Sequence, residues 1–273
     1  MNRDINEVEF TIFDTETTGL EPASGDRIVE IAGIRCKGKE KIATFQSLIN
    51  PGRVISEAAF AVNHITQDML KDAPGREEIM PKFLEFIQGS CLCSYNATFD
   101  LEFLNNELKI IGKNALTDIA VVDILKMAKR LLPGLERYAL WFVADKLQIK
   151  AQQVHRAASD VELALGAFNK LNGILKAKGI SDFNTFSSLF AIDARFLENI
   201  NAQKIAQIQQ AIDLGVKIKI KYLSASGAEV TEREVIPGEI KQENGRSYLV
   251  GHCYLRNEER TFRIDGILHL EII

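Results

Sequence analysis

The sequence contains little of three things: long apolar runs, cysteine and positive charge. A helix that crosses a membrane needs about 18 consecutive apolar residues, and the 273 residues contain neither such a run nor an apolar signal-peptide core near the N-terminus. We therefore expect a cytoplasmic protein without a membrane partner. Four cysteines are too few for a disulfide framework in so long a chain. Cys91 and Cys93 lack a second pair of metal ligands, so we expect all four to be reduced.

The formal net charge of −4 arises from 33 basic and 37 acidic residues. Such a balance provides no bulk positive field for a polyanion, which argues against a protein that simply coats nucleic acid. An acidic site neutralised by bound metal ions fits the balance better. The length is near twice that of an average domain, and a hydrophobic content of 46 % with a charged content of 26 % is ordinary for globular proteins. We therefore expect two folded domains.

The first part of the chain, residues 1–178, has the pattern of an α/β layered domain. Three apolar runs, VEFTIF, RIVEIAGIRC and KIATFQSLIN, predict an antiparallel meander, with Lys37 and Gly38 at the turn between the second and third. Helical spacing follows, interrupted by the short apolar strand CLCSY. The predicted helices cover about residues 81–88, 99–108, 125–132, 138–147 and 157–178.

A domain boundary is expected after residue 178. The segment 179–205 contains the turn-like stretch SDFNTFSSLF and is interpreted as a linker. The second predicted domain covers residues 206–273, and an amphipathic helix over 202–214 leads into it. Its five β-like runs, separated by turn residues, are typical of a small all-β barrel or sandwich. These runs are VKIKIKY, EVTEREVIPGEI, RSYLVGHCYL, RTFRID and ILHLEII.

The first strand ends in two carboxylates on its core face. Val8, Phe10 and Ile12 share one face by the alternation of a strand, and the same parity continues to Asp14 and Glu16. Two neighbouring acids at the edge of a core repel each other and lose hydration, so they need a cation or a shared proton. Hard oxygen ligands of this kind suit Mg²⁺ or Mn²⁺. The alternative is that DTETTG is only a polar turn that closes the strand.

Three further residues have the chemistry of such a site, and each has a simpler alternative. Asp100 follows the strand CLCSY at the start of a helix, where an acid also favours the helix N-terminus. Asp160 lies at the edge of the apolar stripe of its helix, whereas a surface acid more often lies opposite that stripe. His155 lies in the loop before this helix, either to take a proton from a bound water or as a solvated side chain.

The segments DTETTG, SYNATFDLEFL and HRAASD resemble, in this order, the three exonuclease motifs of the DEDDh family, which includes the epsilon proofreading subunit of bacterial DNA polymerase III. The resemblance covers about residues 7–176 and extends to FQSLINPG and NHITQDML. A histidine five residues before the last aspartate marks the histidine subclass of that family. The resemblance implies a ribonuclease-H-like fold and the removal of nucleotides, as 5′-monophosphates, from a 3′ end.

By the same resemblance, Asp14, Glu16 and Asp160 bind two Mg²⁺ or Mn²⁺ ions, and Asp100 joins them directly or through water. Two such ions clamp the scissile phosphate, and His155 takes the proton of the attacking water. The chemistry that the acids require on their own thus agrees with the chemistry that the family motifs imply.

The resemblance also implies a pocket for the terminal nucleotide of a single strand. Two positions depart from the family pattern. Members usually have histidine where Tyr95 stands, and a His-Gly pair where Asn63 and His64 stand. Neither departure removes a metal ligand, but both bear on the preferred substrate. The residues implied to line this pocket are Thr17, Leu20, Asn96 and Phe99.

From about Val216 the chain resembles the WYL domain, a small Sm-like or SH3-like β-barrel found in bacterial regulators and in DNA-repair or defence proteins. The pieces that match are VKIKIKYLSASG, EVIPGEI, SYLVGHC and RTFRIDGI. Ser247 replaces the tryptophan that names the family, and Gly266 replaces a family arginine. We therefore expect the usual ligand pocket of this domain to be altered.

Residues 214–273 carry four lysines and five arginines against eight glutamates and one aspartate, which provides no general attraction for nucleic acid. Binding in this part must be local. Tyr248, Arg260 and Arg263 are the candidate accessory site, because an aromatic ring with arginine suits a nucleotide or a strand end. The alternative is that Tyr248 and Phe262 alternate into the barrel core while the arginines are solvated.

The sequence therefore predicts a metal-dependent 3′→5′ exonuclease for single-stranded ends, DNA in preference, with a WYL-like accessory barrel that binds nucleic acid or a ligand. A DNA polymerase or a repair complex is a possible partner. One alternative is an oligoribonuclease-like enzyme that trims RNA, because nothing in the sequence indicates whether the 2′-OH is read. Another is a non-catalytic nucleic-acid-binding regulator with a degenerate nuclease fold, but such a protein is expected to lack one of the acids.

Overall fold

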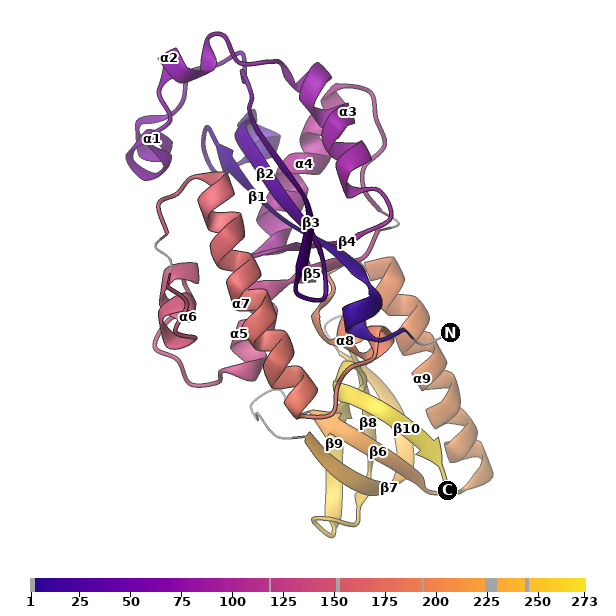
Figure 1. Ribbon diagram of the computed structural model, residues 1–273. Coiled ribbons are helices and arrows are strands. Elements are labelled where there is room, and N and C mark those ends of the chain that lie inside the picture. Colours follow the sequence, from indigo (N-terminus) through magenta and orange to yellow (C-terminus); the bar gives the residue numbers. More distant parts are fainter. Residues whose placement is uncertain (1–2, 118, 151–152, 193, 224–229, 244–245) are drawn as a thin grey trace.

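The computed structural model contains two five-stranded sheets, one from each half of the chain (Figure 1). It describes residues 3–117, 119–150, 153–192, 194–223, 230–243 and 246–273, and only the backbone over 194–203. The predicted loop SASG lies outside the described residues. None of the helices in these ranges is long and apolar enough to cross a membrane. All four cysteines are free and buried, as the sequence predicts.

The first sheet has the order β3-β2-β1-β4-β5. Its first three strands form the antiparallel meander that the apolar runs predict, and β4 and β5 lie parallel to β1. The sequence did not reveal β5, because three residues are too short to show a strand period. The strands are β1 (Glu9–Thr17), β2 (Ile28–Lys37), β3 (Glu40–Leu48), β4 (Cys91–Ser94) and β5 (Val121–Asp123).

Helices cover both faces of this sheet, so β1 is buried on two sides. Phe10 and Ile12 pack with α5, α6 and α7, whereas Phe13 packs with α3 and α4 on the opposite face. The predicted parity of the first strand is therefore confirmed. The helix expected from residue 81 begins earlier, so that Pro81 lies inside it. The helices are α1 (Glu57–Asn63), α2 (Gln67–Leu70), α3 (Arg76–Ile87), α4 (Ala97–Ile110), α5 (Ile124–Leu131), α6 (Leu140–Lys146) and α7 (Ala157–Ala177), with short 3₁₀ turns at Ile5–Glu7 and Pro22–Ser24.

The stretch expected to be turn-like is instead helix α8 (Phe183–Phe190), so that expectation is wrong. The side chain of Asp182 caps it by accepting a hydrogen bond from the Thr185 N–H at 2.8 Å. Phe186 and Phe190 are fully buried, and the ring of Phe186 lies 5.8 Å from that of Phe10. Ser187 and Ser188, which lie between these two phenylalanines, make the apolar face of the helix difficult to recognise in the sequence. The division of the chain at residues 178 and 206 stays a prediction.

Helix α9 (Ala194–Leu214) starts before the predicted amphipathic helix and leads into the second sheet. This sheet is antiparallel throughout, with the order β10-β6-β7-β8-β9, and each of the five β-like runs contributes one strand. No pairing joins β9 to β10 in the described ranges, so closure into a barrel stays a prediction. The strands are β6 (Ile218–Leu223), β7 (Val230–Glu243), β8 (Arg246–Cys253), β9 (Glu258–Arg263) and β10 (Ile267–Ile272), with a 3₁₀ turn at Ile264–Gly266.

The two halves of the molecule are packed against each other. The guanidinium of Arg130, on α5, donates to the carbonyl of Leu223 at 2.7 Å. The hydroxyl of Thr185, on α8, donates to the carbonyl of Leu268 at 3.0 Å. Figure 1 shows α8 between the first sheet and the β6–β10 sheet. The second half is therefore attached through a hydrogen-bonded contact as well as through the chain.

Candidate active site

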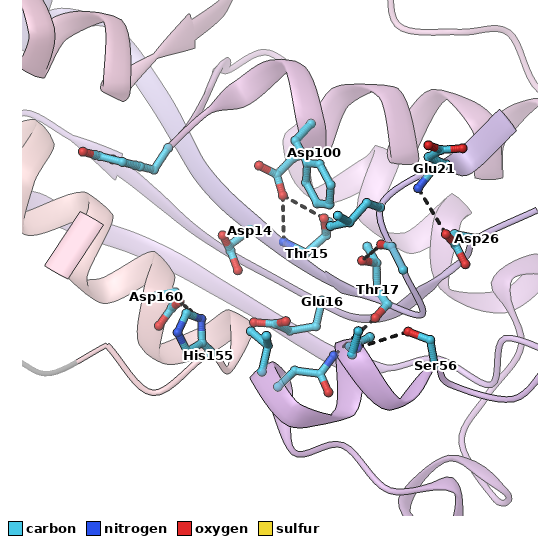
Figure 2. Close-up of a pocket in the computed structure, with 18 of the residues that line it drawn as sticks. Asp14, Thr15, Glu16, Thr17, Glu21, Asp26, Ser56, Asp100, His155 and Asp160 are labelled. Atoms are coloured by element: carbon cyan, nitrogen blue, oxygen red, sulfur yellow. Dashed lines mark hydrogen bonds and ion pairs between the residues drawn. The ribbon is translucent and has the colours of Figure 1, made fainter. Parts of the chain in front are cut away.

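A pocket of about 660 Å³ opens beside the carboxyl end of β1. Its wall comes from β1, the loop after it, α1, the first turn of α4 and the stretch that leads into α7 (Figure 2). The fold joins these distant segments because β4 lies parallel to β1 and α7 packs across β1 and β2. Every residue predicted to act in catalysis lines this one pocket: Asp14, Glu16, Asp100, His155 and Asp160.

Three of these acids form a compact cluster. One carboxylate oxygen each from Asp14, Glu16 and Asp160 lies within 4.8 Å of the others. Asp160 Oδ2 accepts a hydrogen bond from Gln153 at 2.8 Å, whereas its buried Oδ1 has no hydrogen-bond partner among the described residues. Three hard oxygen ligands with an unsatisfied buried oxygen fit a divalent cation of the Mg²⁺ or Mn²⁺ type. The cluster is therefore a candidate metal site.

The electrostatics of the cluster favour neutralisation of its charge. Burial raises the pKa of Asp14 well above its ordinary value, and the charge of Asp100 adds to the effect. Burial and the charge of Asp160 raise the pKa of Glu16 to about 8. Burial also raises the pKa of Asp160, although the hydrogen bond from Gln153 opposes the shift. Carboxylates of this kind retain protons near neutral pH unless a cation replaces them.

Asp100 occupies a different environment from the other acids. Its Oδ1 accepts hydrogen bonds from the N–H and the hydroxyl of Thr15 at 3.0 and 2.7 Å, and its Oδ2 accepts one from the hydroxyl of Ser94 at 2.5 Å. Burial raises the pKa of Asp100 to about 6 against the opposing effect of these bonds. Both oxygens are therefore held between β1, β4 and α4. Its role as a metal ligand, direct or through water, stays a prediction.

His155 lies at the mouth of the pocket, where 47 % of its side chain is exposed. Its Nδ1 lies 4.0 Å from Asp160 Oδ2, and its backbone has a positive φ of 51°. A non-glycine residue in this region of φ is held there by its surroundings. The imidazole is therefore close to the acid cluster while it remains accessible to water.

An ion pair between a buried acid and a partly exposed arginine anchors the segment that carries His155. Glu30, on β2, is fully buried and lies directly opposite Glu16 in the strand pairing. Its carboxylate accepts two hydrogen bonds from Arg156 at 2.9 and 2.8 Å and one from the N–H of Ala157 at 3.1 Å. These bonds fasten the first turn of α7 to the sheet. Sequence reasoning missed Glu30, although a single acid inside the apolar run RIVEIAGIRC was a usable signal.

Gln153, which sequence reasoning missed, and Tyr95, which it noted only as a departure from the family pattern, link the region of α6 to the pocket. The side chain of Gln153 donates to Asp160 and accepts a hydrogen bond at 3.3 Å from the N–H of Trp141, in the first turn of α6. Tyr95 lines the pocket, and its hydroxyl donates to the carbonyl of Tyr138 at 2.7 Å. Tyr95 stands where the resembled family usually has histidine, so this departure creates a contact between the pocket wall and the residues before α6.

The residues implied to bind a terminal nucleotide are only partly assembled. Thr17, Leu20 and Phe99 line the pocket, and Leu20 is 79 % exposed at its rim. Asn63, the other departure from the family pattern, lines it too. Asn96 is not among the lining residues; it precedes α4 with a positive φ of 71°. Their roles in binding stay predictions.

The candidate accessory residues of the second sheet do not form one group. Tyr248 and Arg263 lie opposite each other on β8 and β9, whereas Arg260 pairs with Gly251 and forms an ion pair with Glu258 at 2.6 Å. Arg263 forms an ion pair with Asp265. The alternative that Tyr248 and Phe262 both alternate into the core holds for Phe262 and is wrong for Tyr248, because Leu249 is the residue paired with buried Phe262.

Two family models match the chain. The exonuclease model RNase_T matches residues 11–168, and the WYL domain model matches residues 203–272. The first match includes all five predicted catalytic positions and covers more than half of the chain. The second match covers α9 from residue 203 and the whole second sheet.

Relatives of known name support the first match. The DNA polymerase III subunit epsilon of Treponema pallidum is 42 % identical over 166 residues, which are 60 % of this chain and 76 % of the relative. A DNA polymerase III subunit epsilon-like protein of Rhodobacter capsulatus is 35 % identical over 202 residues, or 72 % of this chain. The chain spans only 28 % of the length of that second relative.

The fold of both halves together also has a counterpart among solved structures. An exonuclease I structure matches 97 % of this chain and 64 % of its own chain, with a TM-score of 0.60 and a sequence identity of 17 %. At this identity the match concerns the fold. It indicates that an exonuclease domain followed by a second β-rich part occurs elsewhere in a similar arrangement.

Proposed function

Because the chain belongs to the RNase_T exonuclease family, we propose that it is a metal-dependent 3′→5′ exonuclease that hydrolyses single-stranded ends, DNA in preference, to nucleoside 5′-monophosphates. The observation that carries this proposal is the convergence of Asp14, Glu16 and Asp160, from two distant segments, within 4.8 Å of one another. His155 lies at the mouth of the pocket that contains these acids. A degenerate, non-catalytic member would be expected to lack one of these groups.

The acid cluster would hold two divalent cations, Mg²⁺ or Mn²⁺. Bound there, the cations would neutralise the carboxylates, polarise the scissile phosphate and stabilise the departing 3′ oxygen. Asp14, Glu16 and Asp160 would supply the ligands, and Asp100 would join them directly or through water. Its hydrogen bonds to Thr15 hold it at the end of β1. The buried, unpartnered Oδ1 of Asp160 supports a ligand role for that residue.

His155 would act as the general base. Water attacks the phosphorus that joins the last two nucleotides, and its proton passes to the imidazole. The bond from this phosphorus to the 3′ oxygen of the preceding nucleotide breaks, that oxygen takes a proton from solvent, and the last nucleotide leaves as a 5′-monophosphate. The Glu30–Arg156 pair supports this role, because it fastens the residue that follows His155 to the sheet. Proton transfer to a positioned side chain accelerates such reactions by roughly 10² to 10⁴-fold.

The terminal nucleotide would enter the pocket between Leu20 and Phe99, with Thr17 beside the phosphate. A preference for DNA rests on the relatives named as DNA polymerase III subunits, so a polymerase or repair complex is the proposed partner. The WYL domain would contribute an accessory contact with nucleic acid or a ligand. Trimming of short RNAs is the second candidate, and the same experiment separates it from the first.

The test is the degradation of matched single strands of DNA and RNA, labelled at either the 3′ or the 5′ end, with Mg²⁺, Mn²⁺ or a chelator. We expect immediate release of the 3′ label as a mononucleotide, a ladder of shortened 5′-labelled products, and no reaction with the chelator. Faster loss of RNA than of DNA would favour the trimming enzyme. Release of the 5′ label first, or no hydrolysis of any strand, would contradict the proposal.

A further inference from the structure

The chain has a single tryptophan, and it lies half exposed in the first turn of α6. Trp141 is 47 % exposed, and its ring packs edge-on against that of Phe142, with the centroids 5.5 Å apart. An exposed aromatic ring of this size on a folded surface is often a contact for a partner. Its neighbours indicate which kind of partner fits.

Two cationic side chains lie close to these rings. The guanidinium carbon of Arg137 lies 5.8 Å from the Trp141 ring and 5.7 Å from the Phe142 ring, and Lys146 Nζ lies 5.0 Å from the Phe142 ring. In the part of the chain that the structure describes, neither cation forms an ion pair, although the acids Glu136 and Asp145 are close in sequence. We refer to Arg137, Trp141, Phe142 and Lys146 as the Trp141 patch.

The Trp141 patch is connected to the pocket by two hydrogen-bonded links. Gln153, in the pocket wall, accepts a hydrogen bond from the backbone N–H of Trp141 and donates one to Asp160. Tyr95, also in the wall, donates to the carbonyl of Tyr138, one residue after Arg137. One residue, Gln153, therefore separates the backbone of Trp141 from Asp160 along a chain of hydrogen bonds.

Resting on the exonuclease function proposed above, we propose that the Trp141 patch binds the nucleotides that precede the terminal one in a single strand. Trp141 stacks against a base, and Arg137 and Lys146 contact backbone phosphates. Aromatic rings with unpaired cations are the chemistry that holds single-stranded nucleic acid without regard to sequence. The terminal-nucleotide pocket selects the end, and the patch increases affinity for strands of more than one nucleotide.

The test uses the fluorescence of Trp141, which is free of background from other tryptophans. The full-length protein is titrated in a chelator, so that no strand is degraded, with thymidine 5′-monophosphate and with oligothymidylates of two, four and eight nucleotides. We expect quenching by the tetramer and octamer and none by the mononucleotide. In parallel, binding of a fluorescently labelled tetramer is followed by anisotropy, so that variants without tryptophan can be compared.

Substitutions then separate stacking from charge. Trp141→Ala should weaken binding of the tetramer about 5- to 100-fold, the usual effect of removing one stacked base contact, and Trp141→Phe should restore most of the loss. Arg137→Ala should reduce the slope of log Kd against log salt concentration by about 0.7, as expected for one lost phosphate contact on a single strand. The matched control is Tyr254→Ala, because Tyr254 is 45 % exposed beneath Lys217 in the turn after β8 and should not affect binding of the tetramer.

The outcomes distinguish this inference from the proposed function. If the protein removes 3′ nucleotides while the tetramer neither quenches Trp141 nor loses affinity in Trp141→Ala, the inference is wrong and the exonuclease proposal stands. If the tetramer quenches Trp141 and the protein hydrolyses no strand, the patch is supported and the exonuclease proposal fails. An equal loss of affinity in Trp141→Ala and Tyr254→Ala also contradicts the inference, because the effect is then not specific to the patch.

Discussion

Two regions of this molecule each contain several buried side chains of like charge, acids in one region and cations in the other. The two regions differ in the partners that offset the repulsion between these charges. At the pocket, Asp14, Glu16 and Asp160 converge, and one oxygen of Asp160 has no hydrogen-bond partner among the described residues. Between the two sheets, the cations of Lys126, Arg130 and Lys204 converge. Each of these cations donates to a main-chain carbonyl: Ala191 at 3.2 Å, Leu223 at 2.7 Å and Ile267 at 2.7 Å.

The pKa shifts in the two regions have the same physical cause. Burial lowers the pKa of Lys204 to about 8 and raises the pKa of Glu16 to about 8, because desolvation disfavours the charged form of either group. Each cation between the sheets donates to a main-chain carbonyl, and the charge of Asp265 acts favourably on all three, although Arg130 Nε has no hydrogen-bond partner among the described residues. The acids of the pocket lack such partners. We therefore expect the pocket to depend on added cations and the contact between the sheets to be independent of them.

The largest expected effect follows from removal of a carboxylate. Asp14→Asn should reduce hydrolysis by at least about 10³-fold, because a bound metal stabilises the transition state by several kcal/mol and each 1.4 kcal/mol is tenfold in rate. The metal-free variant should nevertheless unfold at a higher temperature than the wild type, because one repelling charge is gone. Hydrolysis rates of both proteins with Mg²⁺, and their thermal unfolding in chelator, check this. A variant that is inactive and less stable would indicate a structural role for Asp14.

Replacement of the imidazole should have the next largest effect. His155→Ala should lower kcat by roughly 10² to 10⁴-fold while the affinity for a short strand stays nearly unchanged, because the side chain is exposed and its role lies in proton transfer. Saturation kinetics with a labelled strand measure both quantities. An unchanged kcat would assign His155 to the solvated side chains without a role in the reaction.

Disruption of the cationic contact should affect stability and not metal dependence. Arg130→Ala leaves the buried carbonyl of Leu223 without its donor, which should cost about 1–3 kcal/mol of unfolding free energy. Urea unfolding with and without Mg²⁺ measures the loss, and Arg246→Ala, an exposed arginine on β8, is the control. Equal losses of unfolding free energy in Arg130→Ala and Arg246→Ala would show that the contact with Leu223 does not stabilise the protein.

A further expected effect is a dependence of stability on pH. The pKa of Glu16 is raised to about 8 in the folded state, above its ordinary value near 4, so the folded protein holds this proton more tightly than the unfolded chain. The stability that this proton provides is present at low pH and is lost as pH rises toward 8. In chelator, the unfolding temperature of Glu16→Gln relative to wild type should therefore increase between about pH 5 and pH 8. A constant difference would contradict the assigned shift.

Much of the fold and the acid cluster could be predicted from local patterns. Strand alternation placed Asp14 and Glu16 on the face of Phe10, and the five β-like runs became five strands. Helix α8 could not be identified from composition, because its two serines and one threonine are buried among phenylalanines only in the folded chain. The helical spacing of Phe183, Phe186 and Phe190, which places them on one face, was the usable signal.

The positioning residues of the site depend on contacts between distant segments. Glu30 and Arg156 are 126 residues apart, and Tyr95 and Tyr138 are 43 residues apart. No local pattern predicts such pairs. The side of the sheet on which Tyr248 lies was also not predictable, because the pairing of Leu249 with Phe262 depends on the register between β8 and β9.

The central claim is that the pocket acids form a site for divalent cations. It is tested most directly by titration of the wild type and of Asp14→Asn with Mn²⁺ at about pH 8, followed by thermal unfolding, with Arg130→Ala as the control from the other charged region. We expect Mn²⁺ to raise the unfolding temperature of the wild type and of Arg130→Ala and to have little effect on Asp14→Asn. An equal rise in all three proteins, or no rise in the wild type, would contradict it.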